Sequence, residues 1–506
     1  MFRYIDNLLN RITMYRLVLY YLCVLWVVAF IFSCFGILAY EPFGMVITAI
    51  LILCVCWLAN VILASTFEAP VNVESVYITA LILMLILTPI KSADPYSYWV
   101  FLVMASLGAI ASKFIFAIGK KHVFNPAAFG VALVAFAGVY SASWWLGTEY
   151  MLPFVLVGGL LIIRKLQRSD LAFSFIIAAF VSITVSTWLR GFDPISAVQR
   201  AFLHSPIFFF AFVMITEPLT TPPTRAMRIM YGAFVGALFS PSIGIVGIQS
   251  TPELALLVGN VFSYLVSPKT KMMLRLKEVI PTGTDLYDFV FTPDKKLKFK
   301  AGQYLEWTLA HSPSDARGNR RYFTIASSPT EPEIRMGVKF YPASSTFKKK
   351  LASLQAGDVI VGSQLAGEFT LPKDKKKKLV FIAGGIGVTP FRSMVKNIID
   401  TNEKRDVVMF YSAKTPAELA YRNIFDQASR NGNFKMVYAV NDAPQSWQGL
   451  TGYITADMIM KEVPDHAERF FYISGPRSMV VMFEDALKKL GVPKNQIKTD
   501  FFPGFV

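Results

Sequence analysis

The chain has 506 residues, 54% of them hydrophobic, and a formal net charge of +16 from 50 Lys and Arg against 34 Asp and Glu. This length predicts two or more domains. The basic residues are spread along the chain without a recognition motif, so the charge argues against a nucleic-acid partner and favours anionic lipids and phosphate-bearing cofactors.

Residues 1–267 contain about ten apolar runs of membrane-spanning length or slightly less. These runs lie at about 17–38, 44–65, 74–90, 97–117, 126–146, 150–163, 171–188, 201–215, 229–246 and 252–267. A spanning helix needs about 20 apolar residues, and the sixth and eighth runs are short. The first run is long and lacks a small-residue cleavage site, so we do not expect a cleaved signal peptide. We predict a polytopic α-helical bundle of about ten spans in the lipid bilayer.

The segments between these runs differ in positive charge, which sets orientation in a membrane. With a cytoplasmic N-terminus, the inner segments carry Arg3, Arg11, Arg16, Lys120, Lys121, Arg164, Lys165, Arg168, Arg225 and Arg228. The outer segments carry only Lys91, Arg190 and Arg200. We therefore predict a multi-pass protein of the inner (cytoplasmic) membrane, with the N-terminus and the C-terminal half in the cytoplasm.

Cysteine and histidine are scarce, which limits the redox centres that the chain can hold. All four cysteines, Cys23, Cys34, Cys54 and Cys56, lie in the first two runs. A plant-type iron–sulfur cluster needs four thiolates at close spacing. We expect structural cysteines, with a cluster or metal shared with a partner subunit as the alternative. Only His122 and His204 are near the membrane, too few for the axial pairs of a haem relay, and no metal site is predicted.

Residues 268–506 alternate charged and apolar segments, as soluble domains do. Short strands separated by turn signals predict an antiparallel β-barrel over 268–372. They lie at 272–279, 287–292, 303–309, 321–325, 334–340 and 358–363. Over 373–506, strands alternate with helices, which predicts a mostly parallel α/β sheet with crossover helices. The segments are 379–383 then 391–399, 406–411 then 416–429, 435–440, and 470–473 then 479–490.

Two motifs in this half point to phosphate-bearing cofactors. In Arg321-Tyr322-Phe323-Thr324, strand alternation places Arg321 and Phe323 on one face, and a guanidinium suits a phosphate. Gly384-Gly385-Ile386-Gly387 follows an apolar strand and opens a helix at Thr389-Pro390. Glycines let the backbone approach a phosphate, and the helix N-terminus favours its charge.

In this order the two motifs resemble the ferredoxin–NADP reductase superfamily, from about residue 270 to the C-terminus. The resemblance implies FAD binding, with Arg321 at the pyrophosphate, Phe323 on the isoalloxazine and Thr324 near its reactive N5 edge. It implies further FAD contacts at Tyr322, at Ser345 and Thr346 in a second element (residues 344–347), and at Gly367 in a third (residues 367–369). It places NAD(P)H at Gly384, Gly385, Gly387, Thr389, Gly475 and Pro476.

The same resemblance suggests catalytic residues, namely Thr324, Ser474 and Phe502. Ser474 stands where the family usually has a cysteine before Gly-Pro. The tail resembles the family's aromatic tail, so Phe501 or Phe502 is expected to cover the flavin and yield to nicotinamide. Ser412, Lys414 and Arg422 are candidates for a 2′-phosphate, which leans towards NADPH over NADH; a solvated basic rim is the alternative.

The membrane half resembles the flavin-carrying membrane subunit of sodium-pumping NADH:quinone reductases and Rnf complexes over about 40–267. The resemblance rests on residues 120–130 (KKHVFNPAAFG) and 216–224 (TEPLTTPPT). Asn125 and Glu217, beside prolines, suggest broken helices that bind a polar ligand, with capped helix ends as the alternative. The family's Ser-Gly-Ala-Thr attachment motif is missing, so a second flavin, FMN or riboflavin, is expected to be non-covalent.

These patterns predict a membrane flavoprotein, an NAD(P)H dehydrogenase. Electrons from NADH or NADPH would pass through FAD to the membrane flavin and then to a quinone or another acceptor across the membrane. The alternative is a transporter or anchor bundle with an attached flavin reductase. A homo-oligomer or partner subunits stay open.

Overall fold

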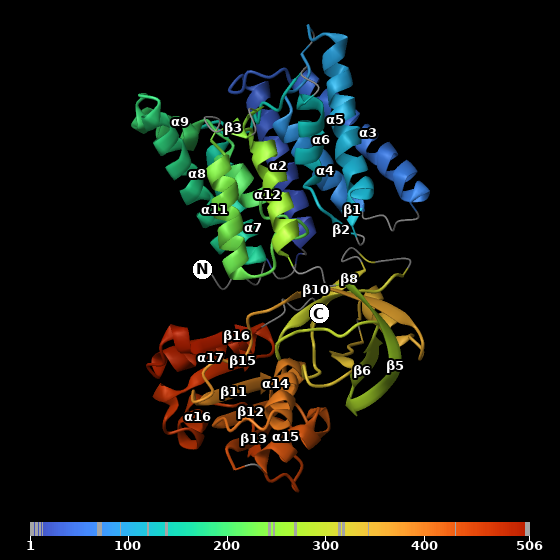
Figure 1. Ribbon diagram of the computed structural model, residues 1–506, viewed down its shortest axis with the longest axis vertical. Helices are drawn as coiled ribbons and strands as arrows, with labels where there is room; N and C mark the ends of the chain where they lie inside the picture. The colour runs from blue at the N-terminus through green and yellow to red at the C-terminus, as the bar shows by residue number, and fades with distance from the viewer. Residues whose placement is uncertain are drawn as a thin grey trace. The chain divides into compact units, whose positions relative to one another are not determined.

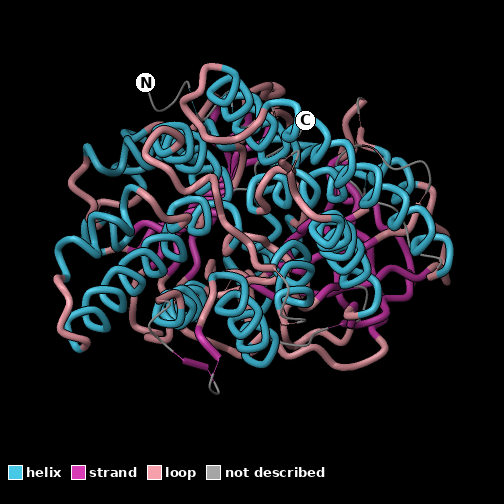
Figure 2. Tube along the Cα trace, turned by 90° about the horizontal axis from the view of Figure 1, so that it is seen from above, coloured by secondary structure: helices cyan, strands magenta, loops and turns pink. Residues whose placement is uncertain are grey.

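The computed structural model describes residues 5, 9, 12, 14–67, 73–91, 93–118, 121–136, 140–240, 244–245, 248–267, 271–311, 315, 319–342, 344–430 and 432–500. The chain forms two compact units, Met1–Ser267 (unit 1) and Pro268–Val506 (unit 2) (Figure 1). Unit 1 is almost entirely helical, whereas unit 2 is built on two six-stranded sheets, whose strands are magenta in Figure 2.

Unit 1 repeats one order of elements. Its first part has α2 (Met14–Cys34), α3 (Pro42–Thr66), α4 (Val73–Ile86), α5 (Tyr96–Ile115), the hairpin β1 (Ala117–Ile118) and β2 (Lys121–His122), and α6 (Pro126–Ala135). Its second part has α7 (Leu152–Leu166), α8 (Ser169–Leu189), α9 (Pro194–Leu203), α10 (Ile207–Phe209), the π-helix η1 (Phe210–Met214), α11 (Arg225–Leu238), the hairpin β3 (Gly244–Ile245) and β4 (Ile248–Gln249), and α12 (Pro252–Val266). A helix, a hairpin and a proline-started helix therefore follow one another twice.

The expectation of about ten spans is not supported. Among the described residues, four helices are long and apolar enough to cross a membrane, namely α2, α3, α5 and α8. A fifth is counted if α9 and α10–η1, bent by 61°, form one span. The apolar helices α4, α6 and α12 are 10–15 residues long, which at 1.5 Å per residue is only about 15–22 Å. An apolar run in this unit can therefore be a short buried helix instead of a span. The run predicted from residue 126, for example, forms a helix that ends at Ala135.

Small residues let the helices of unit 1 approach closely. A Cβ on Gly130 of α6 would lie 2.2 Å from the Ala105 carbonyl oxygen of α5, and one on Gly236 of α11 would lie 2.4 Å from the Phe175 carbonyl oxygen of α8. Such contacts are typical of helix pairs in membranes. They fix the α5–α6 and α8–α11 pairs at backbone distance.

The first sheet of unit 2 is antiparallel, with the strand order β8-β7-β10-β5-β6-β9. Its strands are β5 (Lys271–Gly283), β6 (Leu286–Pro293), β7 (Tyr304–Thr308), β8 (Arg320–Thr324), β9 (Ile334–Lys339) and β10 (Val359–Ala366), and helix α13 (Thr346–Ala352) precedes β10. The sheet surrounds one apolar core with Trp307, Phe291 and Phe347 fully buried. All six strands expected from the sequence are present.

The second sheet is parallel, with the order β14-β13-β12-β11-β15-β16. Its strands are β11 (Leu379–Gly384), β12 (Val407–Ala413), β13 (Phe434–Val440), β14 (Leu450–Thr451), β15 (Phe470–Ser474) and β16 (Ile497–Asp500). Alternate residues of β11 pack on α14 (Thr389–Asp400) and α15 (Arg422–Ser429) on one face, and on α16 (Ala456–Glu462) and α17 (Arg477–Lys489) on the other. The expected α/β sheet is thus covered on both sides, with its loops at the carboxyl ends of the strands.

Four 3-10 turns complete this half: η2 (Gly385–Val388), η3 (Pro416–Glu418), η4 (His466–Glu468) and η5 (Lys494–Gln496). The helix expected over 416–429 is divided into η3 and α15. The break lies at Tyr421, whose backbone is left-handed (φ 61°) and whose hydroxyl reaches Asp288 of the antiparallel sheet at 3.2 Å.

Candidate active site

The first motif lies on β8, an edge strand paired with β7. Alternation places Arg321 and Phe323 on one face, where both meet Phe347 of α13. The Arg321 guanidinium lies 5.2 Å from the centre of the Phe347 ring, and the Phe323 ring centre lies 6.0 Å from it. The strand therefore presents a cation and an aromatic ring side by side, the arrangement expected for a flavin nucleotide.

An anion already lies at the proposed pyrophosphate position. Asp315 Oδ1 is 3.3 Å from Arg321 Nη2, and Asp315 Oδ2 accepts a hydrogen bond from the Thr346 backbone N–H at 3.2 Å. Ser345 caps α13 by accepting from the Lys348 N–H at 3.3 Å. A guanidinium and a backbone N–H that hold a carboxylate are the donors that a phosphate requires. The Asp315 carboxylate is thus a stand-in, and Arg321, Ser345 and Thr346 fit a pyrophosphate.

The remaining residues of this motif lie close by. Tyr322 is on the opposite face from Arg321 and donates its hydroxyl to Glu306 Oε2 at 2.9 Å. Thr324 is buried at the end of β8. Gly367 adopts φ 118°, which favours glycine, and its carbonyl accepts from Gln303 Nε2 at 3.3 Å. Sequence reasoning did not single out the buried carboxylate Glu306.

The glycine loop lies at the carboxyl end of the parallel sheet. The end of β11 lies between Ser412 of β12 and Ser474 of β15. A Cβ on Gly387 would lie 2.6 Å from the backbone of Gly475, so glycine is needed for these two loops to touch. The structure therefore brings Gly387, Ser412, Ser474 and Gly475 to one edge of the sheet.

The loop continues directly into a helix N-terminus. Gly384 ends β11 and faces Pro476, which precedes α17. Gly385 has φ 51° with open space around it. The 3-10 turn η2 runs directly into α14, which begins at Thr389, and the Thr389 N–H donates to the Ile386 carbonyl oxygen. The open backbone at Gly385, at the start of this helical segment, fits a dinucleotide phosphate.

Asp500 is a candidate that sequence reasoning did not single out. It ends β16 and lies opposite Ser474 in the parallel register. Burial raises the pKa of Asp500 to about 7. The expected catalytic Ser474 thus has beside it a carboxyl group whose pKa lies above its ordinary value. Phe501 and Phe502 follow directly and lie outside the described residues.

The three residues expected at a 2′-phosphate differ in their surroundings. Ser412 is at the sheet edge, opposite Gly384 in register. Lys414 is exposed and lies 3.8 Å from Asp442. The Arg422 guanidinium stacks over Tyr438 at 5.0 Å. Lys414 thus matches the solvated rim, whereas Arg422 is held by an aromatic ring.

Buried polar contacts join the antiparallel half of unit 2 to segments that cover its parallel sheet. Arg392 of α14, 3% exposed, pairs with Glu331 and donates to the Ala326 carbonyl oxygen at 3.0 Å. Asp288 is fully buried; it accepts from Arg335 of its own sheet at 2.8 Å and from the Tyr421 hydroxyl, which precedes α15, at 3.2 Å. Burial raises the pKa of Asp288, and the hydrogen bond from Arg335 opposes that rise. These contacts hold the flavin side and the nucleotide side of the unit in a fixed relation.

Unit 1 contains a polar cluster built around its own expected residues. Glu217, which follows shortly after η1, receives His122 Nε2 at 2.8 Å and Asn125 Nδ2 at 3.0 Å. The Asn125 N–H donates to Asn260 Oδ1 at 2.8 Å, and Asn260 Nδ2 donates to the Tyr231 hydroxyl at 2.9 Å. Asn125 also caps α6, as the alternative interpretation expected, and its binding of a polar ligand stays a prediction. His122, Asn260 and Tyr231 join the cluster without having been predicted.

Known proteins resemble this chain in its reductase half. Residues 381–485 match the family model described as an oxidoreductase NAD-binding domain. The glycine betaine monooxygenase reductase subunit of Chromohalobacter salexigens is 28% identical over 236 residues, covering 45% of this chain and 63% of the relative. One subunit of the Na(+)-translocating NADH-quinone reductase of Yersinia pestis is 36% identical over 160 residues, covering 30% and 39%. The Amycolatopsis cytochrome P450 reductase GcoB has a TM-score of 0.42 at 22% identity, covering 47% and 72%.

The chain spans less than two thirds of the length of the first of these curated relatives. Together with the NAD-binding match, they confirm the class of the C-terminal half. It resembles the reductase components of flavin-dependent, NAD(P)H-linked oxidoreductases. The roles of the individual site residues stay predictions.

Proposed function

We propose that this chain is a membrane-bound NAD(P)H-oxidising flavoprotein. Electrons from NAD(P)H pass through FAD in unit 2 to a second, non-covalent flavin in unit 1, and then to a quinone or another acceptor. The observation that carries the proposal is the presence, in one chain, of a reductase module and of a helical unit with a buried polar cluster. The similarity to a subunit of a Na(+)-translocating NADH-quinone reductase supports a quinone as the acceptor.

The residues of unit 2 bind and orient the cofactors. FAD, when bound, supplies the chemistry of accepting a hydride and releasing single electrons. Arg321 and the Thr346 N–H hold its pyrophosphate in place of the Asp315 carboxylate. Gly387 and Gly475 leave room for the nicotinamide nucleotide beside Ser474. The buried pairs at Arg392 and Asp288 keep the two sites in register.

The surface of unit 1 supports a place in the bilayer. Ile177, Val181, Trp188 and Leu189 of α8 are each more than half exposed. An apolar stripe of this kind is costly in water and suits lipid. A cytoplasmic N-terminus and a cytoplasmic unit 2 stay predictions, because the charges of the loops were counted for about ten spans.

The polar cluster is the proposed site of the second flavin, FMN or riboflavin. Amide, carboxylate and imidazole groups are the partners that the polar edge of an isoalloxazine requires. Buried polar groups in a membrane unit are costly and mark functional sites. Residues 120–130 and 216–224, which supply His122, Asn125 and Glu217, also carry the resemblance to the membrane flavin subunits. The absent Ser-Gly-Ala-Thr motif supports non-covalent binding.

The test compares two acceptors in the full chain. Glu217→Gln keeps the size of the side chain but removes the charge that His122 and Asn125 share. We expect at least a roughly tenfold loss of quinone reduction, about 1.4 kcal/mol, with the rate towards a soluble artificial acceptor unchanged.

Glu253→Gln is the matched control. Glu253 is a second buried carboxylate of unit 1, in the first turn of α12, and accepts from Trp144 Nε1 at 3.0 Å outside the cluster. It should keep both rates. Unchanged quinone reduction in Glu217→Gln would contradict the assigned role of the cluster, and equal loss of both rates would show misfolding of the variant.

A further inference from the structure

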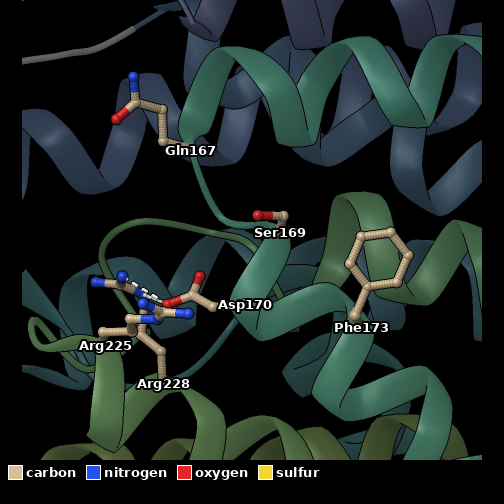
Figure 3. A pocket seen from close by; sticks show the side chains of 6 residues that line it. All are labelled: Gln167, Ser169, Asp170, Phe173, Arg225 and Arg228. Atoms are coloured by element: carbon tan, nitrogen blue, oxygen red, sulfur yellow. Dashed lines mark hydrogen bonds and ion pairs between the residues drawn. The ribbon is translucent and has the colours of Figure 1, made fainter. Parts of the chain in front are cut away.

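A cavity of about 400 Å³ lies in unit 1 at the start of α8 and α11. Figure 3 shows it lined by Gln167, Ser169, Asp170, Phe173, Arg225 and Arg228. The two arginines come from α11 and the other side chains from the α7–α8 turn and α8. None of these residues belongs to the polar cluster around Glu217.

The charged side chains of the cavity are Asp170, Arg225 and Arg228. Arg228 donates to Asp170 Oδ2 from Nη2 at 2.6 Å and from Nε at 2.9 Å, and its Nη1 donates to the Pro223 carbonyl oxygen at 3.0 Å. Arg225 is exposed at the first position of α11. Two guanidinium groups against one carboxylate leave the cavity positive, and two helix N-termini add to that potential. The cavity therefore favours an anion.

One acceptor in the cavity lacks a donor. The Asp170 side chain is 9% exposed, and its Oδ1 has no hydrogen-bond partner among the described residues. A buried carboxylate oxygen without a donor costs free energy comparable to a lost hydrogen bond. Figure 3 places this carboxylate between Ser169 and the arginines. A ligand that suits the cavity combines a negative group with a hydrogen-bond donor.

The cavity opens onto an apolar stripe. Phe173 is 50% exposed, and Ile177 and Val181 follow it on the same face of α8 at 63% and 56%. Met230, on the neighbouring α11, is 58% exposed. A free phosphate would use none of this surface, whereas an amphiphile would use both parts.

We propose that this cavity binds the head group of an anionic phospholipid of the phosphatidylglycerol class. The phosphate lies against Arg225 and Ser169, a glycerol hydroxyl supplies the donor for Asp170, and the acyl chains follow Phe173 and Ile177. Basic pockets between membrane helices bind anionic head groups in this way. The inference rests on the proposed bilayer location and is independent of the proposed electron path.

The experiment titrates the delipidated full chain with short-chain phosphatidylglycerol, short-chain phosphatidylcholine or inorganic phosphate, and native mass spectrometry counts the bound lipid. We expect saturable binding of phosphatidylglycerol and weak binding of phosphatidylcholine. Arg225→Gln should raise the Kd for phosphatidylglycerol about fivefold, which is about 1 kcal/mol for one basic side chain. Arg225→Lys should keep most of the affinity, and Arg200→Gln, an exposed arginine of α9, should change nothing.

Equal affinity for the two lipids, displacement of the lipid by millimolar phosphate, or an unchanged Kd in Arg225→Gln would each overturn the assignment. Retention of the chain in membranes washed with alkaline carbonate separates the two proposals. Loss of the chain in that wash would contradict the bilayer location itself, whereas retention without lipid selectivity would contradict only this inference.

Discussion

At the scale of single residues, the proposed FAD site of the reductase half is built from charged groups with specific partners. Arg321 shares the Asp315 carboxylate with the Thr346 N–H, so the same two donors are available to a phosphate when that carboxylate moves away. The site therefore carries its own counter-ion, which FAD would displace if it binds as proposed.

Arg321→Ala should weaken FAD binding about ten- to a hundredfold, because a charge-assisted contact contributes about 1.5–3 kcal/mol. Titration of the apoprotein with FAD, followed by flavin fluorescence, measures the Kd. Arg320→Ala is the matched control, since Arg320 lies on the other face of β8, 3.8 Å from Glu306. If Arg321→Ala binds FAD as the parent does, this residue is not the pyrophosphate partner.

Asp500 gives unit 2 a pH dependence of defined sign. Because the pKa of this carboxyl is raised from 3.8 to about 7, the folded state binds its proton more tightly than the unfolded state. Its contribution to stability is complete below about pH 4 and is lost as the pH rises to about 7. Asp500→Asn should therefore flatten the fall in the thermal unfolding temperature of unit 2 between about pH 4 and 7. Parallel curves for parent and variant would show that the carboxyl ionises at its ordinary pKa.

Several single residues were beyond prediction because their chemistry is made by the fold. Asp315 and Glu306 are ordinary carboxylates in the sequence, and only pairing with Arg321 and Tyr322 distinguishes them. Asp500 becomes unusual through burial beside Ser474. Arg321, Phe323 and the glycines were predictable because a strand period or a backbone approach restricts the residue type at each position.

At the scale of elements, the glycine loop and the loop after β15 need each other. Gly387→Ala should reduce NAD(P)H affinity at least about tenfold, because the added Cβ would lie 2.6 Å from Gly475 and force the loops apart. Steady-state kinetics with a soluble acceptor should show a raised KM for NAD(P)H while FAD content is unchanged. Gly357→Ala, in a turn with open space around it, controls for general destabilisation. An unchanged KM in Gly387→Ala would place the nucleotide elsewhere.

Helices and strands were predicted well where the hydrophobic pattern of the sequence has a single period. The strands of unit 2 follow alternation or apolar runs bounded by turns, and all six strands of the antiparallel sheet were found. Helix 416–429 was divided because Tyr421 takes a left-handed backbone to reach Asp288, a tertiary contact that local sequence does not show. In unit 1 the number of spans was overestimated. A short buried helix such as α6 is as apolar as a membrane-spanning helix, so hydropathy does not distinguish the two.

At the scale of the whole molecule, the proposed electron path requires both units. The reductase module has no cysteine, and the helical unit has too few histidines for the axial pairs of a haem relay, which is why flavin is the proposed carrier in both. The domain limits of 268–372 and 373–506 within the reductase half stay predictions.

The membrane flavin is expected to leave the chain on denaturation. No Ser-Gly-Ala-Thr motif occurs, and residues 194–199 read Pro-Ile-Ser-Ala-Val-Gln. A denaturing gel viewed under ultraviolet light should show no fluorescent band at full length. A fluorescent band would contradict non-covalent binding and would direct attention first to Ser196.

Flavin stoichiometry of the purified full chain tests the central claim most directly. Acid extraction and chromatography should release two flavins per chain, one FAD and one FMN or riboflavin. The absorption spectrum should show the flavin bands, bleached by NAD(P)H, and no Soret band. A single FAD per chain, or a haem spectrum, would contradict the account.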